Sequence, residues 1–126
     1  MQTQSVRTID SYAHSEIKKL FWFLFVESRG ANSRIRIISV LRNIPRNRNQ
    51  LSTELDLDYK AIQHHLKVLE KYNFVIKTGN RYGLTFCVSG LFENNEIIFD
   101  EIISKLKNGV IKFGKNSVNS WFGKKR

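Results

Sequence analysis

Cysteine, proline and long apolar runs are scarce in this 126-residue chain. The single cysteine, Cys87, excludes a disulfide framework within the chain and a cysteine-rich zinc site. We expect it to be an ordinary core or edge residue of a strand. The one proline, Pro45, and the absence of low-complexity tracts argue against long disordered linkers. The apolar run at residues 20–26 is far too short to span a membrane, which requires about twenty residues. Because the N-terminal residues are polar and contain no secretory signal, we expect a cytoplasmic protein.

Catalytic and metal-binding patterns are missing as well. The sequence has no phosphate-cradling glycine loop, no nucleophile elbow and no spaced carboxylate pair. Its histidines are His14, His64 and His65. Adjacent residues of a helix point about a hundred degrees apart, so the pair cannot easily hold one metal ion. The sequence therefore predicts a protein that is not an enzyme and that needs neither a cofactor nor a metal.

Acidic residues are few, and the chain is strongly basic. It has 21 lysines and arginines against 11 acids, a net charge of +10 and a pI of about 10.0. This balance favours a polyanionic partner, with nucleic acid first and an acidic membrane surface second. The length allows one small domain with appendages and a single core.

Two short amphipathic helices lie back to back between residues 49 and 71. Leu51 and Leu55 are one helical turn apart in the first helix. An apolar stripe of Ile62, Leu66 and Leu69 runs along the second, and Asp58 is placed to cap its start. The other face of the second helix carries donors and one aromatic ring without an acid: Tyr59, Lys60, Gln63, His64 and Lys67. This arrangement predicts a helix-turn-helix whose second helix lies against a negative surface.

The residues after these helices favour DNA binding over a merely solvated face. Two amphipathic helices joined by a turn occur in many folds, and a lysine-rich face is usually just solvated. Here Asn73 can close the second helix in a left-handed conformation. Two β-like runs follow, FVIKT and YGLTFCV, with the hairpin signal Gly79-Asn80-Arg81 between them. Helix, helix and hairpin in this order predict a winged helix.

The run LSTELDLDYKAIQHHLKVLEKYNFVIK resembles the DNA-binding segment of ArsR-like winged-helix transcriptional regulators, particularly the archaeal type. The resemblance covers roughly residues 32–90, and HHLKVLEKYNFV is its most specific part. Asp56 and Asn73 stand where the family frequently has glycine, and both residue types tolerate the left-handed conformation. The first helix lacks the paired cysteines of the metal-sensing branch, so metal sensing is not implied. The resemblance implies a winged-helix fold that binds DNA.

Arginine is concentrated before the helix-turn-helix. Arg46 and Arg48 lie in the loop that precedes it, and their planar guanidinium groups suit phosphate, so we predict phosphate contacts there. Arg34 and Arg36 cannot face the same way on one helix, so at least one should be only solvated. The region between Ser28 and Thr53 contains six arginines and no acid: Arg29, Arg34, Arg36, Arg42, Arg46 and Arg48.

Helices are also expected on both sides of the winged helix. Ser11 can cap a helix from Tyr12 to about Glu27, whose second half, LFWFLFV, is apolar on every face. In the favoured interpretation, this helix packs between the winged-helix core and a partner subunit. The alternative is a membrane-surface anchor with Lys18 and Lys19 at the headgroups.

The first helix of the core should begin at Asn32 or Ser33. Its expected inward stripe consists of Ile35, Ile38 and Leu41, extended by Ile37 and Ile44.

A further helix is expected from Glu93 to Lys107. Its apolar residues follow the three-and-four spacing of a helix that pairs with another helix. The tail from residue 108 to 126 is basic, and the sequence leaves open a DNA-contacting arm, a weak membrane-surface segment or a packed continuation. The expected seam consists of Phe99, Ile102, Leu106, Val110 and Phe113.

These patterns predict a mainly α protein with a small β-hairpin wing. The expected organisation is an N-terminal tail and apolar helix at 1–30, a winged-helix DNA-binding domain at 31–91, and a C-terminal helix and basic tail at 92–126. We expect a homodimeric, sequence-specific regulator of transcription with helix 58–72 in the major groove of double-stranded DNA. The wing at 74–88 would reach the flanking backbone or minor groove. Alternatives are a winged-helix protein-interaction module and a membrane-tethered DNA-binding protein.

Candidate site residues follow from this arrangement. Gln63 is the best candidate for reading a base, because glutamine can pair bidentately with adenine. The predicted DNA contacts are Arg46, Arg48, Tyr59, Lys60, Gln63, His64, Lys67, Lys77, Asn80 and Arg81. The predicted dimerisation residues are Phe21, Trp22, Leu24, Phe25, Phe99, Ile102 and Leu106.

Overall fold

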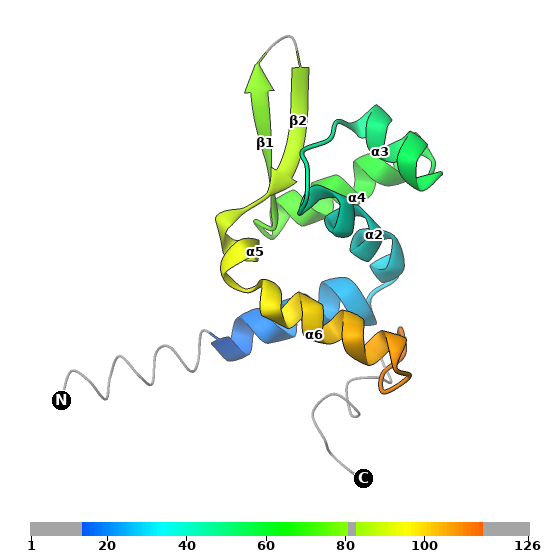
Figure 1. Ribbon diagram of the computed structural model, residues 1–126, viewed down its shortest axis with the longest axis vertical. Coiled ribbons are helices and arrows are strands. Elements are labelled where there is room, and N and C mark those ends of the chain that lie inside the picture. Colours follow the sequence, from blue (N-terminus) through cyan, green and yellow to red (C-terminus); the bar gives the residue numbers. More distant parts are fainter. Residues whose placement is uncertain (1–13, 81–82, 115–126) are drawn as a thin grey trace, which may run out of the picture. The chain divides into compact units, whose positions relative to one another are not determined.

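The computed structural model describes residues 14–80 and 83–114 (Figure 1). They form two compact units. One unit is continuous in sequence, residues 32–96, and the other combines the described residues before and after it.

The unit of residues 32–96 is a winged helix, as predicted (Figure 1). The sequence order is three helices, an antiparallel hairpin and a short closing helix. The elements are α2 (Ala31–Leu41), α3 (Arg48–Leu55), α4 (Tyr59–Lys71), β1 (Val75–Asn80), β2 (Gly83–Val88) and α5 (Gly90–Asn94).

Side-chain caps and one left-handed residue define the helix-turn-helix. Asn47 and Gln50 form a capping box at the start of α3, and each accepts a backbone N–H of the other. Asp56 ends that helix in the left-handed region, at φ 53°. The carboxylate of Asp58 then accepts the N–H of Lys60 and caps α4, as predicted. The apolar stripes of both helices are buried: Leu51, Leu55, Ile62, Leu66 and Leu69.

The first strand of the hairpin reaches two residues further than the sequence pattern indicated. Asn73 has φ 65°, as predicted for the end of α4, and β1 and β2 then pair from Val75↔Val88 to Asn80↔Gly83. Gly79 and Asn80, expected in the turn, are the last residues of β1. Gly79 still needs to be glycine, because it has φ 108° and a Cβ there would lie 2.0 Å from the carbonyl oxygen of Gly83.

The loop before α3 is attached to the hairpin through the backbone. Arg46 donates its N–H to the carbonyl of Phe86 and accepts the N–H of the same residue, at 3.1 and 2.8 Å. This isolated bridge places the segment between α2 and α3 beside β2 (Figure 1). The loop that leads into the helix-turn-helix is therefore anchored to β2 of the wing.

The first helix of the core begins at Ala31, one residue before the predicted start. Four of its expected inward residues are buried: Ile35, Ile37, Ile38 and Leu41. The expected extension of this stripe to Ile44 is wrong. Ile44 is 43% exposed, because α2 ends at Leu41 and the chain turns before Ile44.

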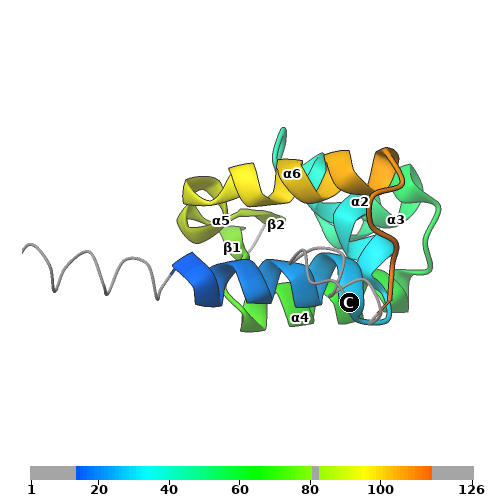
Figure 2. The same cartoon turned by 90° about the horizontal axis from the view of Figure 1, so that it is seen from below.

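The other unit packs the two ends of the described chain together. Residues 14–22 are helical and continue into the π-helix η1 (Phe23–Glu27), which lies beside α6 (Glu96–Lys107) (Figure 2). The rings of Phe25 and Phe99 meet edge to face with centroids 5.1 Å apart. Gly114 donates its N–H to the carbonyl of Val26 at 2.8 Å. The predicted cap Ser11 lies outside the described residues, as do Tyr12 and the tail from residue 115.

The single helix predicted from Glu93 to Lys107 is two helices. Asn95 separates α5 from α6, and its side-chain amide donates to the carbonyl of Leu91 at 2.9 Å. This bond engages a terminal carbonyl of α5 and favours ending the helix there. Within the described ranges, no helix is long and apolar enough to cross a membrane.

Candidate nucleic-acid interface

The outward face of α4 presents the side chains expected to meet DNA. Tyr59, Lys60, His64 and Lys67 are exposed, and Gln63 is half-buried. The helix contains no acid before Glu70. The positive end of the helix dipole also lies at this N-terminal end. The face therefore offers cationic, hydrogen-bonding and aromatic groups over a fully buried stripe.

The two adjacent histidines of α4 have different environments. His64 is exposed, whereas His65 is only 8% exposed and its Nδ1 lies 3.3 Å from Nη1 of Arg34. Burial lowers the pKa of His65 to about 4, and the positive charges of Arg34 and His64 add to this effect. A neutral ring accepts the arginine N–H at Nδ1 and carries its own proton on Nε2. His65 is therefore a structural residue that links α4 to α2.

The expectation that Arg34 or Arg36 is only solvated is wrong. Arg34 is 3% exposed, and burial lowers its pKa. Arg36 is half-buried and donates to the carbonyl of Leu55, the last residue of α3. Both arginines therefore fasten α2 to the helix-turn-helix, on opposite sides of one helix.

Arg46 and Arg48 gather around Phe86 at the base of the wing. Nε of Arg46 donates to Oε2 of Glu54 at 2.8 Å. The guanidinium of Arg48 lies over the ring of Phe86, 5.0 Å from its centroid. Nε of Arg48 is buried and has no hydrogen-bond partner among the described residues. The guanidinium of Arg48 therefore lies beside β2, and the guanidinium of Arg46 is held at α3.

The described part of the wing holds one of its predicted contacts. Lys77 is exposed and its Nζ lies 3.8 Å from Oε2 of Glu70. The hydroxyls of Thr78 and Thr85 pair across the strands at 2.9 Å. The side chain of Asn80 and all of Arg81 lie outside the described residues.

Two acids of this surface, Glu54 and Glu70, were not predicted from the sequence. Glu54 and Glu70 each hold a cation predicted to bind DNA. Glu54 follows Arg46 by eight residues, and Glu70 precedes Lys77 by seven, and each pair joins different elements. Neither spacing has a meaning within one helix or strand, so no local signal was available. Among the described residues, no group of three or more His, Cys, Asp or Glu could hold a metal ion.

The residues predicted for dimerisation are mostly buried within the chain itself. Only Leu106 among them is partly exposed. The exposed apolar residues of the same unit are others: Phe23, Ile97, Val110 and Phe113. The buried members of the predicted set are Phe21, Trp22, Leu24, Phe25, Phe99 and Ile102.

Comparison with known proteins connects this site to a family. Residues 32–77 match the family model described as bacterial regulatory protein, arsR family, which confirms the resemblance seen in the sequence. No curated protein sequence matches the chain.

Solved structures share the fold at low sequence identity. HlyU from Vibrio cholerae N16961 is 22% identical with a TM-score of 0.53, over 73% of this chain and 94% of that one. The transcriptional regulator SlyA is 13% identical with a TM-score of 0.54, over 94% and 81%. A MarR family protein from Bacillus stearothermophilus is 9% identical with a TM-score of 0.54, over 97% and 86%.

Proposed function

We propose that this chain, whose residues 32–77 carry an arsR-family helix-turn-helix, regulates transcription as a sequence-specific homodimer on double-stranded DNA. The family and the winged-helix fold are those of DNA-binding transcriptional regulators, which are not enzymes. In this proposal α4 enters the major groove, and the hairpin reaches the flanking backbone or minor groove.

The outward face of α4 is the observation that carries the proposal. It extends from Tyr59 to Lys67 without an acid, and the opposite face is buried against the core. A helix held this firmly on one side can enter a groove without giving up core contacts. Lys60, His64 and Lys67 then contact base edges or adjacent phosphates, and Gln63 reads a base.

Phosphate contacts at the base of the wing fix the orientation on the duplex. Arg48 supports this role because stacking on Phe86 already holds its guanidinium in place. The position of Arg46 is also fixed, because its backbone pairs with that of Phe86 in β2. Lys77, on β1, is a further proposed contact, and Asn80 and Arg81 are proposed from the sequence alone.

Dimerisation supplies the second recognition helix. One winged helix gives limited specificity, whereas a two-fold dimer reads two half-sites spaced by one helical turn of DNA or a multiple of it. Support for the interface comes from the exposed apolar residues of the terminal unit, of which Ile97 is 75% exposed. A second copy is the partner that would cover them in a symmetric assembly.

A salt-dependent titration of duplex DNA tests the function. Neutral substitution of Arg46, Arg48 or Arg81 should weaken binding to specific and random duplexes alike. Each should also lower the slope of log affinity against log salt by about one unit, because one counterion-releasing contact is lost.

Lysines on and off the proposed surface provide a matched control. Lys60→Gln should weaken duplex binding, whereas Lys107→Gln, an equal loss of charge at the end of α6, should leave it nearly unchanged. Absence of salt-dependent binding by the wild-type protein would rule out the DNA proposal and favour a protein-interaction module. Equal losses in the two variants would mean that the charge of the chain acts without a defined face.

A further inference from the structure

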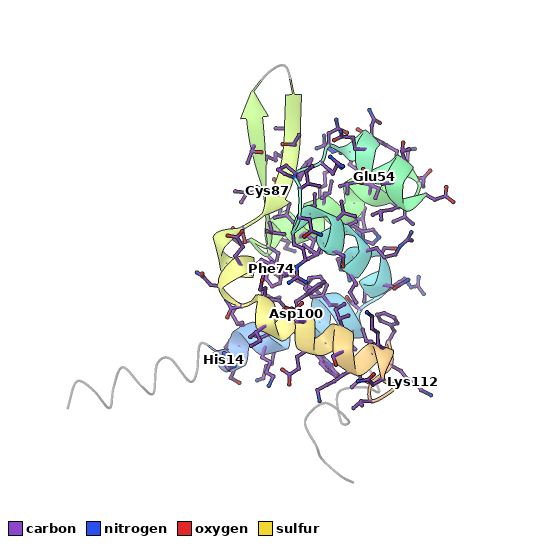
Figure 3. The ribbon with its side chains drawn as sticks, in the orientation of Figure 1. His14, Glu54, Phe74, Cys87, Asp100 and Lys112 are labelled. Atoms are coloured by element: carbon purple, nitrogen blue, oxygen red, sulfur yellow. The ribbon has the colours of Figure 1, made fainter. Side chains whose placement is uncertain are left out.

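The carboxylate of Glu54 forms an ion pair with Arg46, a residue that the proposed function assigns to a DNA phosphate. Oε2 of Glu54, in the last turn of α3, accepts the Nε–H of Arg46 at 2.8 Å. This distance is in the range of a charge-assisted hydrogen bond. Figure 3 shows Glu54 on α3. The pair closes a link between the helix-turn-helix and the loop beside the wing.

The backbone of Arg46 is held in place beside β2. Both main-chain hydrogen bonds to Phe86 fix the point from which the side chain starts. The guanidinium therefore either remains near Glu54 or turns toward a neighbouring anion within its own reach. A duplex seated on α4 and the wing would bring a phosphate to this region.

We propose that Glu54 competes with the DNA phosphate for Arg46 and thereby lowers the affinity of the protein for any duplex. This inference rests on the proposed DNA-binding function. In the free protein the carboxylate neutralises Arg46, and on binding a phosphate oxygen takes its place. Glu54 is thus a regulator of affinity within the binding surface, although it contacts no DNA.

The partial exposure of the pair makes such an exchange feasible. The side chain of Arg46 is 24% exposed and that of Glu54 is 39% exposed. Ion pairs in this setting are weak, because water screens the charges and two long side chains must be ordered. A phosphate also accepts hydrogen bonds from arginine in a planar, bidentate arrangement. The ion pair can therefore break when a duplex arrives.

Two other predicted DNA-contacting cations of this surface, Lys77 and Arg48, have no comparably close carboxylate in the part of the chain that the structure describes. Lys77 and Glu70 are 3.8 Å apart, beyond hydrogen-bond distance, so Glu70 should compete less strongly for its cation. Arg48 stacks on Phe86 and has no ion pair among the described residues. Competition for a DNA-facing cation is therefore expected to be strongest at Glu54.

A double-mutant cycle on random duplex DNA tests the inference. Glu54→Gln keeps the shape of the side chain and removes its charge, and Arg46→Gln removes the proposed phosphate contact. We expect Glu54→Gln to raise the affinity about two- to five-fold in the wild-type background, the range that a broken surface ion pair allows. In the Arg46→Gln background the same substitution should have little effect. Asp56→Asn, which removes an acid two residues away, measures the effect of charge alone.

The possible results separate the two proposals. An equal gain from Glu54→Gln with and without Arg46, or a gain no larger than that of Asp56→Asn, would overturn the competition. A loss of affinity would also overturn it, because Glu54 would then position Arg46 for DNA. Failure of the wild-type protein to bind any duplex would instead remove the proposed function and this inference with it. Without DNA, the Arg46 Nε–H should exchange with water more slowly in the wild-type protein than in Glu54→Gln, and equal exchange would contradict the ion pair.

Discussion

At the scale of single residues, two neighbouring histidines of α4 lie in opposite environments. His64 faces solvent, whereas His65 is buried against Arg34 of α2. The periodicity of the sequence was sufficient to place the two rings on different faces. It could not identify Arg34 as the partner, because an arginine on an apolar helix is ordinarily taken to be solvated. The partner was set by tertiary packing between helices that are 31 residues apart at this contact.

The buried histidine should make the module sensitive to acid. The pKa of His65 is lowered to about 4 in the folded protein, against 6.5 for the unfolded chain. Between these values the unfolded chain binds a proton that the folded protein does not, so stability falls as the pH drops through this window. From pH 7 to pH 4.5, the contribution of His65 should amount to a loss of about 2 kcal/mol.

Denaturant unfolding at the two pH values measures this loss. His65→Gln should show a smaller fall in stability than the wild-type protein, because glutamine can accept the arginine N–H without titrating. His64→Gln, at the exposed neighbouring position, serves as the control and should keep most of the wild-type pH dependence, because the charge of His64 is the smallest of the three causes that lower the pKa of His65. Equal pH dependence in all three proteins would contradict the assigned pKa.

Gln63 should determine discrimination rather than overall affinity. Gln63→Ala should reduce the preference for a selected site over a scrambled one by about 1–3 kcal/mol, the value of a bidentate base contact. Binding to random duplex should barely change. Competition titrations with both duplexes give the two numbers, and an equal fall in both would make Gln63 a positioning residue.

At the scale of elements, local chemistry predicted the ends of helices better than their continuity. Asp58, Asp56 and Asn73 act through their own side chains or backbone angles, so the sequence alone placed them correctly. The break at Asn95 and the π-helix η1 were missed. Residues 20–26 are apolar on every face, and residues 93–96 contain neither glycine nor proline, so the sequence marks no interruption at either position. Only hydrogen bonding in the folded chain distinguishes them.

The wing should depend on one of its two glycines. Gly79→Ala requires a residue with φ 108° and a Cβ 2.0 Å from the Gly83 carbonyl oxygen, so the hairpin must distort. We expect a loss of about 1–3 kcal/mol in stability and faster amide exchange in β1 and β2. Gly83→Ala is the matched control, because a Cβ at Gly83 meets nothing within 4 Å. Similar exchange in both variants would show that the strain is absorbed elsewhere.

At the scale of the whole molecule, the sequence could not distinguish buried from exposed apolar residues in the terminal segments. Periodicity identified the terminal apolar residues but could not separate those that pack within one chain from those left exposed. Phe25 and Phe99 pack against each other inside one unit, whereas Phe23 and Ile97 remain exposed. The difference depends on how the two terminal segments meet, which no single segment determines.

The proposed dimer should respond differently to charge at these two kinds of position. We expect a dimer at micromolar concentration, which equilibrium sedimentation measures. Ile97→Glu should dissociate it and weaken binding to a two-half-site duplex while the helical content stays the same. Ile102→Glu, at a fully buried neighbour on α6, should instead unfold the terminal unit, because it buries an unpaired charge. A wild-type monomer at micromolar concentration would remove the dimer.

The separation of two faces on α4 also bears on how such a module could acquire new targets. Ile62 and Leu66 hold the helix in the core, while Tyr59, Lys60 and His64 contribute little to that packing. Substitutions at the outer positions can therefore change the preferred duplex without first lowering stability. A library randomised at these three outer positions should yield mostly folded proteins, so that selection for a new operator would act on recognition alone.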